Sequence, residues 1–273
     1  MVAAIPNVVG QNDFSDTPPG HRFGLYFDAW DQNWKIPDAE KQAALRRVAL
    51  LSGTARQLLS SLHRRQNALA AAVANSIWRR SAKSTAPFLT GTGMEHPLEN
   101  GFAFLNPYGL PYLPGSSVKG VLRRAVELLA NGEFGDQCGW DAAAITTLFG
   151  YEAPSGEQNA PRNRGSLIFW DVLPEPASGK LAVDIMTPHY SHYYQGNSPP
   201  TDSGQPNPIM FLTVPPGSRF DFYVQCQTAT LPEPLRNIWQ SLLDSAFQHA
   251  FDWLGFGAKT AIGYGHLQAP PPA

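Results

Sequence analysis

Pro111-Tyr-Leu-Pro-Gly-Ser-Ser-Val-Lys-Gly-Val-Leu-Arg-Arg-Ala125 is a proline- and glycine-bearing loop that runs straight into a helix. Ser116 or Ser117 is the expected N-cap, because a serine hydroxyl accepts a hydrogen bond from the open amides of a first helical turn. Asn131-Gly132 is a typical helix stop. The residues expected to face inward share helical spacing and are Val118, Val121, Leu122, Ala125, Val126 and Leu129.

A second glycine-bearing loop, Gly255-Phe-Gly-Ala-Lys-Thr-Ala-Ile-Gly-Tyr-Gly265, follows a helix predicted from Leu235 to Leu254. Each loop sets small residues beside a single lysine. Small residues let another molecule's backbone approach closely, and exposed main-chain N–H groups favour anions. Two such loops indicate a phosphate backbone as the ligand. Neither fits the nucleotide P-loop, because the chain has no Gly-x-x-x-x-Gly-Lys-Ser/Thr.

In the first loop the candidate anion contacts are Gly115, Ser116, Ser117 and Lys119. A helix N-terminus carries unpaired N–H groups and about half a positive charge, so phosphate binds there readily. Lys119 adds a full charge, and Arg123 lies one turn further on and could extend the track along an RNA. The alternative is a plain capped helix with a surface lysine.

In the second loop the candidates are Gly257, Lys259, Thr260 and Tyr264. A lone lysine in a glycine loop is usually hydrated and able to meet an anion, and Tyr264 could stack on a base. The alternative is that the glycines only allow the last strand to pack tightly against the helix. Phe256 is expected in the core.

The composition excludes several protein classes. Hydrophobic residues make up 43% of the 273 residues, which is enough for a sizeable core, and no apolar run is long enough to span a bilayer. The N-terminus lacks the charged start and apolar stretch of a signal peptide. Cys138 and Cys226 are too few for a disulfide framework. We therefore expect a cytoplasmic protein.

The net charge of −2 hides a strongly basic segment between Lys41 and Lys83. That segment contains no Asp or Glu, and its nine basic residues are Lys41, Arg46, Arg47, Arg56, Arg64, Arg65, Arg79, Arg80 and Lys83. One explanation is an arm that binds a polyanion. The other is a solvated helical face that offsets acidic groups of its own domain. Composition alone leaves both open.

Strands and helices alternate along the chain. We expect a helical region from Asp38 to about Lys83, broken near Ser52-Gly53, and a mobile Pro-, Gly-, Ser- and Asn-rich loop at about 195–208. The expected strands are 23–28, 85–93, 165–173, 180–186, 209–214 with its continuation 219–225 across a Pro215-Pro-Gly hairpin turn, and 263–267. This pattern favours an α+β sheet of ferredoxin-like type over a doubly wound one.

These motifs resemble the RAMP proteins of type III CRISPR effector complexes. The similar residues run from Gly91-Thr-Gly-Met-Glu-His-Pro-Leu-Glu99 through Gly109–Arg123 to Gly255–Gly265. Two further segments, Asp184-Ile-Met-Thr-Pro-His-Tyr190 with Tyr193-Tyr194 and Pro206–Val214, are more narrowly similar to the subunit of the type III-B (Cmr) complex that caps the filament at the guide RNA 3′ end. Coverage is about residues 84–267, plus the strand expected near Gly24.

The resemblance implies a single RAMP domain over 1–273, with a modified ferredoxin-like (RRM-like) fold and a basic helical insertion at about 38–83. It implies a non-catalytic subunit that contacts the 3′ part of the guide RNA (crRNA) by its backbone and caps the RAMP filament. The implied partners are guide and target RNA, other RAMP subunits and the small helical Cmr subunit. We expect no membrane partner, no cofactor and no metal. The basic segment matches no motif of the family.

Two rival hypotheses stay open. Related RAMP proteins cleave RNA, so the chain could be an endoribonuclease acting on guide precursor or target RNA, with His96, His189 or His192 as candidates. It could also be a protein scaffold with little direct RNA contact, using the aromatic residues 190–194 and the 195–208 loop against neighbouring subunits. We interpret His96 as turn chemistry and the histidine pair as part of an aromatic surface.

Overall fold

The structure is a computed structural model that describes residues 5, 14–133, 135–151, 163–187 and 208–269. The chain forms two compact units, each assembled from segments that are distant in sequence. Unit 1 comprises Met1–Gln57, Leu89–Pro111 and Ser178–Val214, and unit 2 comprises Leu58–Phe88, Tyr112–Ala177 and Pro215–Ala273. Among the described residues, no helix is long and apolar enough to cross a membrane.

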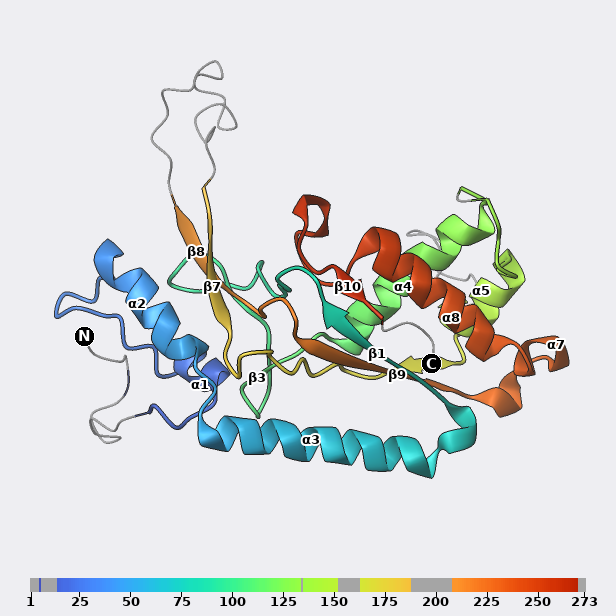
Figure 1. Ribbon diagram of the computed structural model, residues 1–273, viewed down its shortest axis with the longest axis horizontal. Coiled ribbons are helices and arrows are strands. Elements are labelled where there is room, and N and C mark those ends of the chain that lie inside the picture. The colour runs from blue at the N-terminus through green and yellow to red at the C-terminus, as the bar shows by residue number, and fades with distance from the viewer. Residues whose placement is uncertain (1–4, 6–13, 134, 152–162, 188–207, 270–273) are drawn as a thin grey trace, which may run out of the picture. The chain divides into compact units, whose positions relative to one another are not determined.

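Unit 2 is built on a four-stranded antiparallel sheet in the order β10-β1-β9-β6 (Figure 1). The strands are β1 (Ile77–Ser84), β6 (Leu167–Phe169), β9 (Arg219–Cys226) and β10 (Leu267–Gln268). Helix α4 (Gly115–Ala130) connects β1 to β6, and helix α8 (Trp239–His249) lies between β9 and β10 in the chain. This βαββαβ sequence with its first and third strands adjacent is the ferredoxin-like arrangement. The predicted α+β class is therefore confirmed.

The core of unit 2 lies between the sheet and helices α4 and α8 (Figure 1). Alternate residues of β9 point into it, so Phe220, Phe222 and Val224 are at most 1% exposed. Phe247 of α8 stacks on Trp78 of β1 with ring centroids 4.3 Å apart. Phe256 is completely buried against Phe222, which confirms its predicted place in the core.

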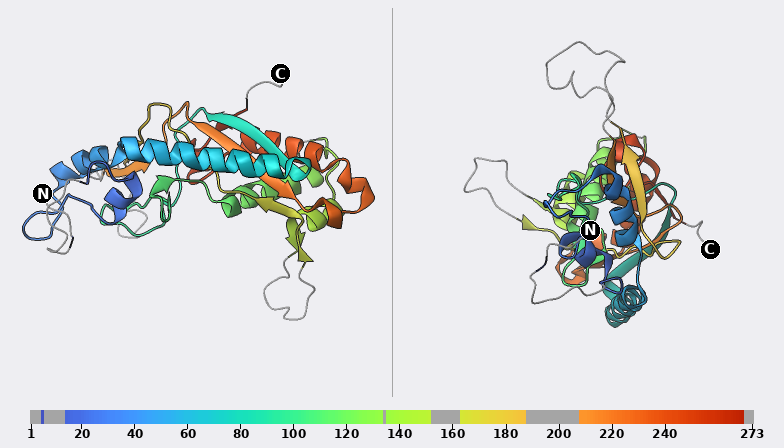
Figure 2. Two further views of the ribbon diagram at one scale, coloured as in Figure 1. Left: turned by 90° about the horizontal axis from the view of Figure 1, so that it is seen from below. Right: turned by 90° about the vertical axis from the view of Figure 1, so that its left-hand side faces the viewer.

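Helix α3 (Gly53–Ala72) covers part of the opposite face of this sheet, as Figures 1 and 2 show for its part in unit 2. The Tyr223 hydroxyl of β9 donates to Asn67 Oδ1 of α3 at 2.9 Å. Gln66 Nε2 donates to the carbonyl oxygen of Asp171 just beyond β6. Helix α3 is thus fastened to the sheet by polar contacts as well as by its buried leucines.

The predicted helical region 38–83 is only partly helical. The break near Ser52-Gly53 is confirmed, because α2 (Asp38–Ala49) and α3 are separate helices. Helix α3 ends at Ala72, and residues 77–84 form β1 instead of a helix. Buried Trp78 and Ala82 point to one side of β1 and exposed Arg79 and Lys83 to the other, which is the period of a strand. Pairing with β9 and β10 overrides the helical pattern there.

Three predicted strand features are wrong. Residues 23–28 lie at the end of helix α1 (Pro19–Gly24), where Pro19 occupies a favoured first helical position. Residues 85–93 form no strand, since regular pairing stops at Ser84 and Pro87 has no N–H for a ladder. The Pro215-Pro-Gly turn joins no hairpin, because the strand before it pairs with β7 and the strand after it with β1 and β6.

The remaining predicted elements are present with shifted bounds. The long helix at 235–254 is divided into α7 (Glu233–Arg236), α8 and a π-helical turn at Ala250–Leu254. The final strand begins at Leu267. The other short elements of unit 2 are α5 (Ala142–Phe149), β4 (Gly150–Tyr151), β5 (Asn163–Arg164) and 3-10 turns at Ala74–Ser76, Thr228–Thr230 and Thr260–Ile262.

Unit 1 combines α1 and α2 with two small antiparallel sheets. One sheet pairs β7 (Ala182–Met186) with β8 (Ile209–Thr213), and the other pairs β2 (Phe104–Leu105) with β3 (Leu110–Pro111). Arg22 of α1 is buried and donates to the carbonyl oxygens of Arg47 and Leu50 at the end of α2. The Arg47 carbonyl oxygen also accepts the amide of Leu50, so the guanidinium adds to the capping of this helix end and ties the two helices together.

His96 is a half-buried structural residue of unit 1. Its ring stacks on Phe23 with centroids 3.7 Å apart, and Nε2 lies 3.0 Å from the Phe23 carbonyl oxygen. Nδ1 accepts a hydrogen bond from the amide of Leu98, so Nε2 is the donor in this tautomer. Burial lowers the pKa of His96 and outweighs the bond to Phe23. The interpretation of His96 as turn chemistry agrees with this geometry.

Two backbones of unit 2 meet where α4 begins beside β6. A Cβ on Gly115 would overlap the carbonyl oxygen of Phe169. Gly120 lies in the same helix with nothing within 4 Å of its Cβ position. The first glycine is therefore required by close approach, whereas the second is not.

We expect Gly115→Ala to lower the free energy of unfolding by about 2 kcal/mol, because the added methyl group must displace the backbone of β6. Gly120→Ala is the matched control and should raise it by about 0.5–1 kcal/mol through helix propensity. Urea denaturation followed by tryptophan fluorescence measures both. Equal stabilisation by the two substitutions would contradict the packing at Gly115.

The lowered pKa of His96 predicts a pH dependence of stability. The unfolded chain protonates this imidazole near its ordinary pKa of 6.5, whereas the folded chain does so only at lower pH. The free energy of unfolding should therefore fall as the pH is lowered from 7.5 through 6.5 to 5.5. Urea titrations across this range should show a weaker fall for His96→Gln than for the unchanged chain. Identical slopes would show that His96 titrates normally in the folded state.

Candidate nucleic-acid interface

Helix α4 begins two or three residues earlier than its sequence predicts. Pro114 is the N-cap residue, and neither Ser116 nor Ser117 caps the helix, since both lie within its first turn. The amide of Gly115 donates to Asp171 Oδ1 at 2.7 Å, and the amide of Ser117 donates to the Pro114 carbonyl oxygen. The N-cap prediction is wrong because Pro114 already has extended backbone and the cap is supplied by Asp171 from beyond β6.

The Asp171 carboxylate changes the electrostatics of this helix end. It places a negative charge against the first amide, where a phosphate was expected to bind. The helix dipole is partly compensated within the protein. Attraction for an external anion must then come mainly from cationic side chains near this turn.

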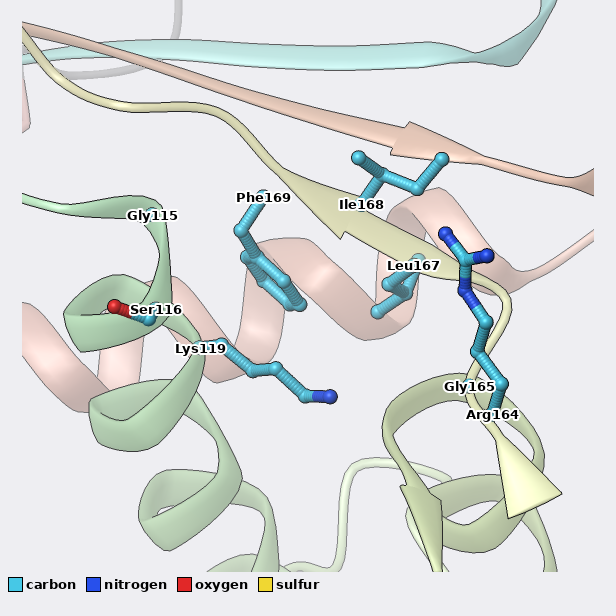
Figure 3. A pocket seen from close by; sticks show the side chains of 8 residues that line it. All are labelled: Gly115, Ser116, Lys119, Arg164, Gly165, Leu167, Ile168 and Phe169. Atoms are coloured by element: carbon cyan, nitrogen blue, oxygen red, sulfur yellow. The ribbon is translucent and has the colours of Figure 1, made fainter.

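Such side chains line a pocket of about 230 Å³ beside the first turn of α4 (Figure 3). Helix α4 contributes Gly115, Ser116 and Lys119 to its wall, and the facing wall is formed by β5 and β6. The lining residues are Gly115, Ser116, Lys119, Arg164, Gly165, Leu167, Ile168 and Phe169. Three predicted site residues are therefore brought together, whereas Ser117 and Arg123 are not part of the lining.

Two positive charges and no acidic side chain line this pocket. Lys119 is half-buried, and Figure 3 shows its side chain extending from α4 into the space before β6. Arg164 is exposed on β5 at the other side. Within the described part of the chain neither cation forms a salt bridge or a side-chain hydrogen bond. The pocket is therefore a candidate site for an anion in unit 2.

Arg164 is absent from the residues that the sequence predicts for the site. Its segment reads as a polar loop, which gives no reason to place it opposite Lys119. The structure does so by pairing β5 with β4, where Arg164 lies opposite Gly150. The sequence feature that could have indicated Arg164 is its position directly before Gly165, where a strand is expected to begin.

Arg123 has partners inside the protein. Its Nε forms a salt bridge with Glu127 Oε1 at 3.2 Å, and Nη1 donates to the carbonyl oxygen of Gly150 at 3.3 Å. The guanidinium thus connects α4 to the start of β4. The predicted RNA contact by Arg123 stays a prediction, and its observed contacts are internal.

The second glycine loop is closed by its own backbone. The amide of Phe256 donates to the carbonyl oxygen of Gly265 at 2.9 Å, and the Gly265 amide donates to Pro87. A Cβ on Gly265 would overlap the Phe256 carbonyl oxygen, so tight packing requires this glycine. The packing alternative explains Gly265 and leaves Lys259 unexplained.

Lys259 has left-handed backbone, with φ at 60°, a conformation uncommon for residues other than glycine. Lys259, Thr260 and Tyr264 are all half-buried, whereas Gly257 is exposed with φ at 91°. None of these four lines the pocket beside α4. The second loop therefore does not contribute these residues to that pocket.

Catalytic or metal-binding clusters do not stand out in the described ranges. No group of three or more His, Cys, Asp or Glu that could hold a metal ion occurs there. Asp141 caps α5 by accepting from the amide of Ala144, and Asp136 accepts from the amide of Cys138. His189 and His192, like the aromatic residues 190–194, lie outside the described residues.

Comparison with known proteins identifies a family and several similar proteins. The RAMP superfamily matches residues 81–268, which is more than half of the chain. The chain is 28% identical over 237 residues to CRISPR system Cmr subunit Cmr6 of Pyrococcus furiosus, covering 68% of this chain and 66% of that relative. It is 27% identical over 168 residues to CRISPR system CMR subunit Cmr6 of Saccharolobus solfataricus, covering 61% of this chain and 47% of that one.

The chain thus spans about two thirds and about half of the length of these relatives. Among solved structures, a chain of the type III-B Cmr-beta complex bound to cognate target RNA superimposes with a TM-score of 0.56 at 21% identity, covering 85% of this chain and 70% of that one. This likeness shows the fold. With the ferredoxin-like order of the sheet, the match over 81–268 shows that the chain belongs to the RAMP superfamily.

Proposed function

We propose that this protein is an RNA-binding subunit of a type III-B CRISPR effector complex and that it contacts the guide RNA without cleaving it. The similarity to two Cmr6 proteins supports the assignment to such a complex. The observation that carries RNA contact is the pocket beside α4, where Lys119 and Arg164 present two charges that no described acidic side chain neutralises.

Recognition should be directed at the phosphate backbone. The pocket offers a hydroxyl and two cations but no side-chain amide or carboxylate that could read a base edge. Binding of this kind depends on counterion release, so it is sensitive to salt and nearly independent of sequence. A guide-binding subunit must accept many spacers, and backbone recognition meets that requirement.

Lys259, Thr260 and Tyr264 are proposed as a second RNA contact together with Gly257, and Ser117 of α4 is proposed as a contact beside the first. The left-handed backbone at Lys259 supports a specialised role for this loop. We further propose that the subunit lies at the 3′ end of the guide and caps the RAMP filament in the cytoplasm. Its partners there would be other RAMP subunits and the small helical subunit.

The two compact units are proposed to form one RAMP domain. The superfamily match spans segments of both units, which supports this view. The basic residues of 41–83 are distributed over α2, α3 and β1 instead of one inserted helix. The hypothesis of a single basic arm is therefore replaced by basic residues on three elements, whose contact with RNA stays a proposal.

The nuclease alternative receives no support from His96, because both ring nitrogens of this half-buried residue are engaged. Its decisive test is to incubate the purified chain with guide-repeat RNA and target RNA, with and without magnesium. We expect intact RNA in every case. Cleavage that His189→Ala or His192→Ala abolishes would establish a nuclease and end the non-catalytic proposal.

The RNA-binding proposal is tested by RNA crosslinking in the assembled complex. We expect the guide to crosslink to peptides containing residues 115–119 or 255–265. A complex in which the guide reaches neither segment would leave the scaffold alternative in its place.

Lys119→Ala and Lys259→Ala should each weaken guide-RNA binding about three- to fivefold, the range of a solvent-exposed ion pair. The loss should be equal for two unrelated spacers, because phosphates are common to both. Filter binding at several salt concentrations measures affinity and slope. Arg124→Ala removes an exposed cation of α4 outside the pocket and serves as the control. A loss confined to one spacer would contradict backbone recognition.

A further inference from the structure

The pocket beside α4 sets one cation on each side of a narrow space. Lys119 comes from the second turn of α4, and Arg164 comes from β5, more than forty positions later in the chain. Ser116 adds a hydroxyl on the side of Lys119, and the lining contains no acidic residue. The charges therefore add within the pocket, and a bound anion between them would lower the energy of both.

Backbone contacts fix the separation of the two walls. On one side, Gly115 brings the first turn of α4 against the backbone of β6 at Phe169. On the other side, a Cβ on Gly165 would overlap the end of α5, so the residue after Arg164 is held against that helix. Both walls are thus set by contacts that only glycine allows, and the gap between Lys119 and Arg164 is a property of the fold.

Arg123 links the two walls of the pocket. Its guanidinium donates to the carbonyl oxygen of Gly150, and Gly150 is the residue that pairs with Arg164 across β4 and β5. Glu127 holds the guanidinium from the same helix. Arg123 therefore connects the helix that carries Lys119 to the strand pair that carries Arg164, without lining the pocket itself.

The size and lining of the pocket limit its ligand. At about 230 Å³ it is smaller than the roughly 300–1,000 Å³ of typical small-molecule sites, so a whole nucleotide cofactor is a poor fit. The part of the facing wall that belongs to β6 is apolar, with Leu167, Ile168 and Phe169 in the lining. Two cations beside this apolar wall suit one phosphodiester with its attached sugar, and no group of β6 in the lining distinguishes bases.

We propose that Lys119 and Arg164 hold the same phosphodiester of the guide RNA from opposite sides, and that Arg123 is a positioning residue for Arg164. This inference rests on the proposed function and adds to it a residue, Arg164, and a shared ligand. It also assigns Arg123 to the support of the site instead of to the RNA track.

The test measures binding of the full chain to fluorescein-labelled guide RNA by anisotropy over a salt series. Lys119→Gln and Arg164→Gln should each weaken binding about three- to fivefold, and the double variant should reduce the salt slope by about 0.7, the value for one phosphate of a single strand. The double variant should lose clearly less than the product of the two losses, because both side chains share one phosphate. Arg124→Gln, with the same loss of charge outside the pocket, should change affinity less than twofold.

Arg123 is tested through its coupling to Arg164. Arg123→Gln should weaken RNA binding in the unchanged chain but have no further effect when Arg164→Gln is already present. Thermal unfolding of each variant reports its folding separately. An equal effect of Arg123→Gln in both backgrounds would mean that Arg123 contacts RNA by itself, and would overturn its positioning role.

Several outcomes would overturn the shared phosphodiester. Full multiplication of the two losses would assign Lys119 and Arg164 to different phosphates, and unchanged binding by folded Arg164→Gln would remove Arg164 from the site. Calorimetric binding of AMP that Arg164→Gln abolishes would instead identify a site for a free nucleotide. Each of these three outcomes overturns only the shared phosphodiester, because the unchanged chain still binds guide RNA and the proposed function stands. If the unchanged chain binds no guide RNA, alone or in its complex, the proposed function itself fails.

Discussion

The arrangement of unit 2 depends on the close approach of α4 to the backbone of β6. A side chain at position 115 would overlap the Phe169 carbonyl oxygen, so the helix can begin there only with glycine. This contact fixes where the first two turns of α4 lie relative to the sheet edge and brings Lys119 over β6. The Asp171 carboxylate then caps the helix, which leaves the lysine and Arg164 as the main attraction for an anion.

The sheet of unit 2 has one face occupied by helices α4 and α8, and α3 covers part of the other face. Single-stranded RNA is bound by RNA-recognition motifs on the open face of a four-stranded sheet, where aromatic residues stack on bases. Here Tyr223 on that face is 6% exposed and donates its hydroxyl to Asn67 of α3. Helix α3 thus covers this face at Tyr223, whereas Arg79, Ser81 and Lys83 of β1 are exposed on the same face.

The basic segment between Lys41 and Lys83 carries a smaller net positive charge in the folded protein than its nine basic residues suggest. Lys41 pairs with Asp38, Arg47 with Asp28 and Arg80 with Asp244, so three of its nine cations have acidic partners within their own unit. Exposed pairs of this kind contribute little to stability, but they do reduce the net charge that a polyanion meets. The pocket at α4 carries only two cations, yet its lining has no opposing charge. Local arrangement matters more here than the number of basic residues.

The amino-acid sequence by itself determined the fold class, the helix after Pro114 and the buried position of Phe256. It also determined three residues that line the pocket. These features follow from local periodicity and from the conformational preferences of glycine and proline. The sequence did not determine which strands pair: residues 77–84 carry a helical composition but form the central strand β1, and the strands on either side of Pro215 find different partners. Arg164 faces Lys119, and Arg123 turns to Gly150, only in the folded chain. Strand partners and facing side chains are set by contacts between distant segments, whose free energy no local pattern contains.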